Sequence, residues 1–127
     1  MVKSLVEKGR FYLNNISKKE AVMPNMVGLW KMNGRQGIFP EFPWEADLLL
    51  EAGNTLTWTE TKGANVGAAR YGRWTLSGNL FYFQYEAPNV GMVTWNGTLD
   101  GAGTGMSGTY NAGANNAYGG SWSARKL

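Results

Sequence analysis

The feature that most constrains the fold of this chain is an alternation of aromatic and polar residues on both sides of a tight-turn sequence, in the stretch Ala68–Glu86. Two strand-like runs meet at Ser77-Gly78-Asn79, residue types that tolerate the positive φ angles of a tight turn. Because successive side chains of a strand point to opposite faces, one face of this β-hairpin is almost wholly aromatic. That face carries Arg70, Gly72, Trp74, Leu76, Phe81, Phe83 and Tyr85. We expect it to line the interior of a small β-barrel, with Arg70 at the end away from the turn.

The same period of two continues from Met26 towards the C-terminus. It divides this part of the chain into short segments at an even spacing, which is typical of an all-β sandwich or barrel. We predict an all-β fold, an antiparallel up-and-down β-barrel whose eight strands follow one another in sequence. The predicted strands are Met26–Asn33, Glu45–Glu51, Thr55–Thr61, Arg70–Leu76, Leu80–Glu86, Gly91–Leu99, Gly105–Asn111 and Tyr118–Lys126.

The connections between the predicted strands fall into two classes. Short turns rich in Gly, Asn and Asp occupy residues 52–54, 77–79 and 100–104, and mostly longer loops occupy residues 34–44, 62–69, 87–90 and 112–117. In up-and-down order the two classes alternate, so the short turns gather at one end of the barrel and the long loops at the other. We therefore expect a closed floor and an open mouth. Function is expected at the mouth, because loops on a rigid scaffold commonly form binding sites.

Residues 1–25 form a separate predicted unit, an N-terminal helix with its linker, ahead of the barrel domain at residues 26–127. Apolar residues recur at helical spacing between residues 2 and 19, and Pro24 ends the pattern. We expect this amphipathic helix to dock on the barrel or on a second subunit. The alternative is a basic helix that lies on a membrane surface.

Composition excludes several function classes. The 127 residues suffice for one hydrophobic core, and the absence of Cys and His rules out a disulfide, a thiolate nucleophile, a Ser-His dyad and the usual zinc site. The net charge of +3 is concentrated in the first twenty residues, so we expect no nucleic-acid partner. No stretch has the pattern of a signal peptide or a membrane span. We expect a cytoplasmic protein without a cofactor, a metal or a membrane partner.

The predicted inward positions are rich in Trp, Phe and Tyr. An eight-stranded barrel has room either for packed side chains or for one small ligand. The interior is therefore either partly open and ring-lined or filled by the rings themselves. Apart from the hairpin, the residues expected to face inward are Trp30, Met32, Leu48, Leu50, Leu56, Trp58, Glu60, Val93, Trp95, Leu99, Met106, Tyr110 and Trp122.

A charged pair is predicted where this interior meets the mouth. Pairing the strands across the 61–69 loop places Glu60 opposite Arg70 and Trp58 opposite Gly72. Such an ion pair either seals the upper core or orients a polar group of a ligand. Gly72 leaves a gap in the wall, which either admits a ligand or accommodates a neighbouring indole.

The loop Gly37–Glu45 combines two prolines with Phe39, Phe42 and Trp44. Stiffness together with apolar surface suits a lid over the mouth or a contact with another subunit, so we expect a homo-oligomer. Its carboxylates, Glu41 and Glu45, are candidates for acid–base chemistry in a chain without histidine.

Tyrosines supply further polar groups at the mouth. Tyr85 is expected beside Arg70 on the neighbouring strand, and Tyr110 near the same rim. Each hydroxyl can donate and accept a hydrogen bond.

The sequence Gly28-Leu29-Trp30 on the first predicted strand, with Arg125 on the last, resembles the calycin group of lipocalins and avidins. In that group a Gly-x-Trp on the first strand is covered by an arginine from the last strand. The resemblance implies an antiparallel barrel that binds a small apolar or ring-containing molecule, with Trp30 and Arg125 structural at the closed end. The design is also similar to allene oxide cyclase-like barrels and to spirotetronate-forming Diels–Alder barrels.

Two main hypotheses of function follow, and both use the same interior. The first is binding of a small, largely apolar or aromatic ligand. The second is a cofactor-independent cyclase or isomerase with Glu60 and Tyr85 as acid–base groups. A third is a sugar-binding or structural module that uses exposed Trp44 and Tyr82. The residues expected to contact a ligand are Trp44, Trp58, Arg70, Trp74, Phe83, Tyr85, Trp95 and Tyr110.

Overall fold

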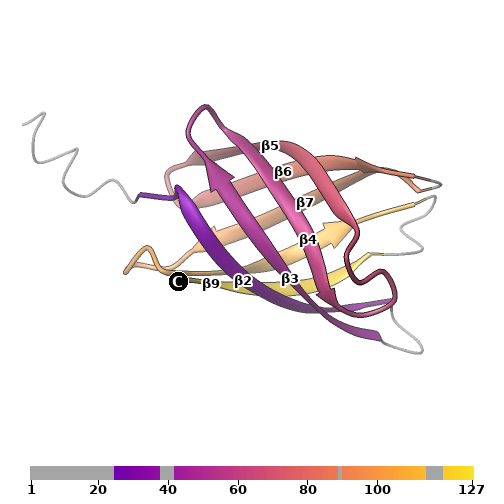
Figure 1. Ribbon diagram of the computed structural model, residues 1–127. Coiled ribbons are helices and arrows are strands. Elements are labelled where there is room, and N and C mark those ends of the chain that lie inside the picture. Colours follow the sequence, from indigo (N-terminus) through magenta and orange to yellow (C-terminus); the bar gives the residue numbers. More distant parts are fainter. Residues whose placement is uncertain (1–24, 38–41, 89, 114–118) are drawn as a thin grey trace, which may run out of the picture.

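A computed structural model describes residues 25–37, 42–88, 90–113 and 119–127, which form a closed barrel of eight antiparallel strands. Each strand pairs with its neighbours in sequence, and β9 closes the barrel against β2 (Figure 1). The predicted all-β, up-and-down barrel is confirmed, whereas the helix predicted at residues 2–19 lies outside the described residues. The strands are β2 (Gly28–Gln36), β3 (Phe42–Glu51), β4 (Thr55–Lys62), β5 (Ala69–Ser77), β6 (Leu80–Ala87), β7 (Gly91–Leu99), β8 (Gly105–Asn111) and β9 (Gly120–Lys126).

The first two strands extend further than the sequence pattern predicted. β2 continues to Gln36 and β3 begins at Phe42, so most of the predicted 34–44 loop is a paired ladder in which Gly34 faces Trp44. Pro43 is the second residue of β3. It is tolerated there because proline lacks the backbone N–H that the centre of a sheet strand uses to pair with its neighbours. Trp44 and Glu45 therefore belong to β3 and not to a lid.

The two ends of the barrel differ as predicted. The short turns at residues 52–54, 77–79 and 100–104 lie at one end, and positive φ angles at Asn54 (67°) and Gly78 (63°) make the first two of them tight. At the other end lie the β4–β5 loop and the C-terminal ends of β2, β6 and β8 (Figure 1). We call these ends the floor and the mouth.

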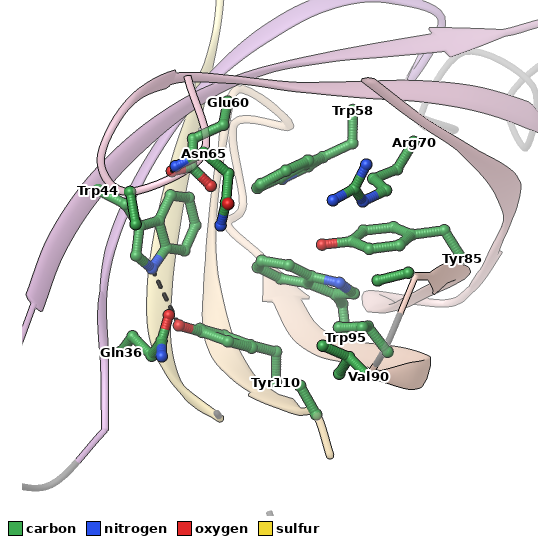
Figure 2. A pocket seen from close by; sticks show the side chains of 14 residues that line it. Gln36, Trp44, Trp58, Glu60, Asn65, Arg70, Tyr85, Val90, Trp95 and Tyr110 are labelled. Atoms are coloured by element: carbon green, nitrogen blue, oxygen red, sulfur yellow. Dashed lines mark hydrogen bonds between the residues drawn. The ribbon is translucent and has the colours of Figure 1, made fainter. Parts of the chain in front are cut away.

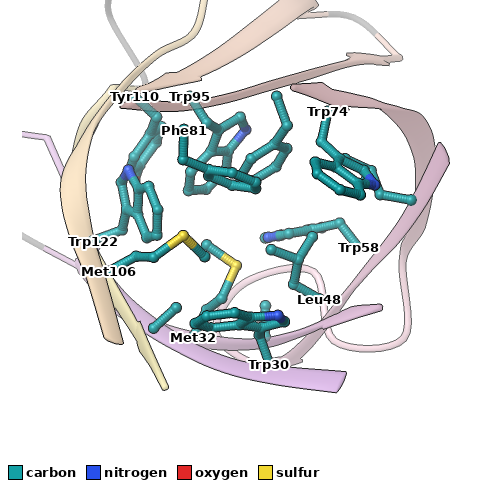
Figure 3. Packing of buried hydrophobic residues seen from close by; sticks show 14 of the residues in the cluster. Trp30, Met32, Leu48, Trp58, Trp74, Phe81, Trp95, Met106, Tyr110 and Trp122 are labelled. Atoms are coloured by element: carbon teal, nitrogen blue, oxygen red, sulfur yellow. The ribbon is translucent and has the colours of Figure 1, made fainter. Parts of the chain in front are cut away.

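Aromatic side chains fill most of the interior (Figure 3). Trp30 and Phe83 are fully buried, and Trp95 is 1 % exposed. The ring of Phe83 stacks on Trp95 with centroids 4.9 Å apart, and Trp95 stacks on Tyr110 at 4.3 Å. This continuous column of rings runs from the middle of the barrel up to the mouth.

Inward-facing glycines make room for these rings. A Cβ atom at Gly97 would lie 2.6 Å from the Trp122 ring, so the missing side chain is what lets that indole cross the interior. At Gly72 a Cβ atom would overlap the backbone carbonyl of Gln84 on β6. The gap predicted at Gly72 is thus taken up by the close approach of the β6 backbone, and the nearest atoms belong to Gln84 and Tyr85, not to an indole.

The closed end departs from the predicted Gly-x-Trp arrangement. Trp30 pairs with Lys126, whereas Arg125 pairs with Lys31 and is exposed on the outer face. The prediction that Arg125 covers Trp30 is wrong, because strand alternation turns Arg125 outward. The Trp30 indole N–H instead donates to the Met26 carbonyl at 2.9 Å.

Candidate functional site

A pocket of about 310 Å³ opens at the mouth of the barrel (Figure 2). Five aromatic side chains form most of its wall: Trp44, Trp58, Tyr85, Trp95 and Tyr110. Its polar side chains are Gln36, Glu60, Asn65 and Arg70. The pocket thus lies at the end where the loops were expected to carry function.

Trp95 on β7 forms the centre of the aromatic wall. Its ring centroid lies 4.3 Å from that of Tyr110 and 6.0 Å from that of Trp58. Trp58 in turn lies 5.4 Å from Tyr85, with the two rings tilted by 33°. The flat faces and edges of four rings therefore converge from four different strands, β4, β6, β7 and β8.

Trp44 is held in the wall by a short chain of hydrogen bonds. Its indole N–H donates to the Tyr110 hydroxyl at 2.9 Å, and this hydroxyl donates to the Arg35 carbonyl at 3.3 Å. Burial raises the pKa of Tyr110 to about 12, with the Trp44 N–H acting in the opposite direction. Trp44 is only 7 % exposed, so the expectation of an exposed Trp44 for sugar binding is wrong.

Glu60 fastens the β4–β5 loop that borders the pocket. Its carboxylate accepts a hydrogen bond from the Asn65 backbone N–H at 2.8 Å, and its own backbone accepts from Gly67 at 2.9 Å and donates to Ala68 at 3.2 Å. Glu60 is 8 % exposed and is the one buried charged residue in the described part of the chain. Sequence reasoning placed it at the mouth but did not predict this role in the loop.

The predicted Glu60–Arg70 pairing is wrong. Arg70 faces Trp58 and Gly72 faces Leu56, which is a register slip of two residues relative to the prediction. Both side chains still point inward, because a slip of two preserves the face, yet no ion pair joins them in the described structure. The Arg70 guanidinium donates instead to the Ala69 carbonyl at 3.3 Å.

Tyr85 keeps its proton in this environment. Burial raises its pKa, and the nearby positive charge of Arg70 offsets only part of this effect. The Trp95 indole N–H also approaches the hydroxyl, although the two do not reach hydrogen-bonding geometry. Tyr85 can therefore donate a hydrogen bond or a proton, but it is not a base at neutral pH.

Several predicted site residues lie away from the pocket. Trp74 is near the floor, where its N–H donates to the Glu51 and Thr55 carbonyls, and Phe83 lies beneath Trp95. Neither residue lines the pocket.

The additional carboxylate that the structure describes, Glu45, does not reach the pocket either. Glu45 was expected near the cavity, but it is exposed and lies 3.8 Å from Lys62 on the outside of the barrel, so that expectation is wrong. Glu41 lies outside the described residues. Glu60 is therefore the carboxylate that the described structure brings to the pocket.

Other pocket residues were missed. Gln36 was missed because the first predicted strand ended too early, and Asn65 and Val90 were missed because they lie in loops without an alternating pattern. Only their location at the mouth, at the end of β2 or within the loops there, could have predicted that they line the pocket.

Comparisons with known proteins do not assign the chain to a family: no protein-family model matches it, and no curated protein does. What the structure shares with calycins is the closed antiparallel barrel of eight strands. In the described part of the chain no helix has the length and apolar character needed to span a membrane. The same residues hold no group of three or more His, Cys, Asp or Glu placed to bind a metal ion.

Proposed function

We propose that this barrel binds a small, largely apolar, ring-containing molecule in the pocket at its mouth. The observation that carries the proposal is the pocket of about 310 Å³, which is walled by five aromatic side chains above a densely filled interior. Binding sites for small molecules are typically concave and apolar, with a few polar groups that fix orientation. A volume at the small end of the usual range suits a compound of about two fused rings.

The wall residues have distinct roles in this proposal. Trp58, Tyr85 and Trp95 contact the ring system of the ligand, and Arg70 orients its polar end. Glu60 holds the loop that borders the pocket, and Trp44 closes the opposite side. A calycin-like assignment is part of the proposal, because lipocalins and avidins resemble this barrel in strand number and closure.

A blocking substitution tests the proposal directly. Val90 lines the pocket and is half-buried at the edge of the core, so Val90→Trp should fill the opening, and a circular dichroism melt of the variant checks that it stays folded. Val66 is 64 % exposed, is not a pocket residue and gives a matched control, Val66→Trp. Isothermal titration with naphthalene, indole and 2-ethylnaphthalene should show saturable binding in the wild type and in Val66→Trp, and loss of it in Val90→Trp. Absence of binding by all three compounds, or equal binding in both variants, would refute the proposal.

The second candidate is a cofactor-independent isomerase or cyclase in the same pocket. It is favoured by one observation, the buried Glu60 carboxylate in the pocket wall. In this case Glu60 accepts a proton and Tyr85, which keeps its own, donates one. Recovery of every bound compound unchanged counts against it, whereas conversion that disappears in Glu60→Gln with binding intact supports it.

A further inference from the structure

The unused hydrogen-bonding groups of the pocket are mainly donors. Arg70 carries several N–H groups, of which one donates to the Ala69 carbonyl. The Tyr85 hydroxyl keeps its proton and donates it to no acceptor in the described structure, while the Trp95 indole N–H approaches its oxygen. Figure 2 shows the Arg70 guanidinium and the Tyr85 hydroxyl facing the same part of the pocket.

The tryptophans also include donors that no acceptor in the described structure satisfies. The chain has six tryptophans, and the indole N–H groups of Trp30, Trp44, Trp74 and Trp122 all donate to oxygen atoms of the protein. The N–H groups of Trp58 and Trp95 are buried and have no partner. These two are the side chains that form the centre of the pocket wall. Buried donors are normally satisfied, so the two exceptions call for an explanation.

The acceptor oxygens of Glu60 and Tyr110 lie on the other side of the pocket, and each of them already accepts a hydrogen bond. One oxygen of Glu60 holds the Asn65 N–H, and the Tyr110 hydroxyl both accepts from Trp44 and donates to Arg35. Figure 2 places Glu60 beside Asn65 and Trp44, across the pocket from Arg70. At the Tyr85 hydroxyl the positive charge of Arg70 has a larger effect than the negative charge of Glu60. The side of the pocket formed by Arg70 and Tyr85 is therefore the electropositive, donor side.

We infer that the ligand is a planar conjugated ring compound that carries an acceptor oxygen of the carbonyl or carboxylate type, bound with this oxygen towards Arg70 and Tyr85. The inference rests on the proposed function and adds the chemical class of the ligand. Conjugation keeps such an oxygen in the plane of the ring. A ring held among the aromatic side chains of the pocket wall then presents the oxygen at its edge, where the donors lie.

The test uses two compounds of nearly the same shape. In 2-acetylnaphthalene a conjugated carbonyl replaces the CH₂ group of 2-ethylnaphthalene. Isothermal titration of the full chain should give at least about tenfold tighter binding of the ketone, because it pairs with donors that the hydrocarbon leaves unused. Tyr85→Phe and Arg70→Ala should each remove most of this preference, measured in each variant as the ratio of its affinities for the ketone and for 2-ethylnaphthalene. Arg73→Ala is the control, because Arg73 lies on the same strand but faces outward and is exposed.

The outcomes distinguish this inference from the proposed function. Equal binding of the two naphthalenes overturns the inference and leaves the proposed function standing. If neither compound binds, both the inference and the proposed function are overturned. Tighter binding of 2-naphthylmethylammonium than of the ketone, lost in Glu60→Gln, also overturns the inference, because the pocket would then select a cation. Circular dichroism melts of each variant show that losses of affinity come from the pocket and not from unfolding.

Discussion

Tyr110→Phe is the substitution whose effect follows most directly from the structure of the pocket wall. The Tyr110 ring stacks on Trp95 at 4.3 Å, and its hydroxyl joins Trp44 to the Arg35 carbonyl. Phenylalanine keeps the ring and its stacking and removes only the oxygen. The substitution therefore isolates the hydrogen bonds that hold Trp44 in place.

The size of the destabilisation depends mainly on the Trp44 indole N–H, which loses its acceptor when the Tyr110 hydroxyl is removed. Trp44 is 7 % exposed and Tyr110 is 5 % exposed, so water cannot readily replace the lost oxygen. A buried donor without a partner costs about 1–3 kcal/mol, and the bond to the Arg35 carbonyl, at 3.3 Å, adds little. We expect Tyr110→Phe to lower the free energy of unfolding by about 2 kcal/mol.

Tyr82→Phe gives a matched control. The Tyr82 hydroxyl donates to the Gln84 side chain at 2.8 Å, but both groups are half-buried on the outer face, where water can substitute. Its loss should cost no more than about 0.5 kcal/mol. Urea unfolding followed by circular dichroism measures both variants, and the slope with urea should stay the same. If Tyr110→Phe were no more destabilising than Tyr82→Phe, the Trp44 hydrogen bond would not be holding the wall.

Two further effects follow from burial and close packing. Gly72→Ala should destabilise the barrel by about 1–3 kcal/mol or more, because its Cβ atom would overlap the Gln84 carbonyl, whereas Gly101→Ala, in an open turn, should be nearly neutral in the same urea assay. Because the folded-state pKa of Tyr110 is about 12 against an ordinary value of 10, the folded protein binds more protons than the unfolded chain between these values. The stability from this group is complete below pH 10 and is lost as the pH rises towards 12, so the free energy of unfolding should fall over this range less steeply in Tyr110→Phe than in the wild type.

The fold and the inward faces could be predicted from the sequence because alternation is a local signal. Trp58, Trp95 and Tyr110 were assigned to the interior from a period of two alone, and all three are buried. The alternation of short turns and longer loops likewise predicted which end opens. Neither of these two predictions depends on the register between neighbouring strands.

Register and strand ends could not be predicted in the same way. A slip of two residues leaves Glu60 and Arg70 facing inward in either alignment, so the hydrophobic pattern cannot choose between them. The observed register between β4 and β5 occurs together with hydrogen bonds in their connecting loop, such as that from the Gly67 N–H to the Glu60 carbonyl. At Arg125 the expectation came from the resemblance to calycins, whereas the alternation that places Trp122 inside turns Arg125 to the surface, as observed.

The contrast between floor and mouth bears on whether the rings are a filled core or a site. Near the floor, Trp30 and Trp74 both donate their N–H groups to backbone carbonyls, as a purely structural core would require. At the mouth, Trp58 and Trp95 are equally well packed but leave theirs without partners. If packing alone had shaped the barrel, a phenylalanine at these two positions would avoid an unsatisfied donor. Beside them, the Arg70 guanidinium has N–H groups beyond the one that donates to the Ala69 carbonyl, and the Tyr85 hydroxyl donates to no acceptor in the described structure. Unused donors that face a pocket are expected where the acceptor comes from a bound molecule.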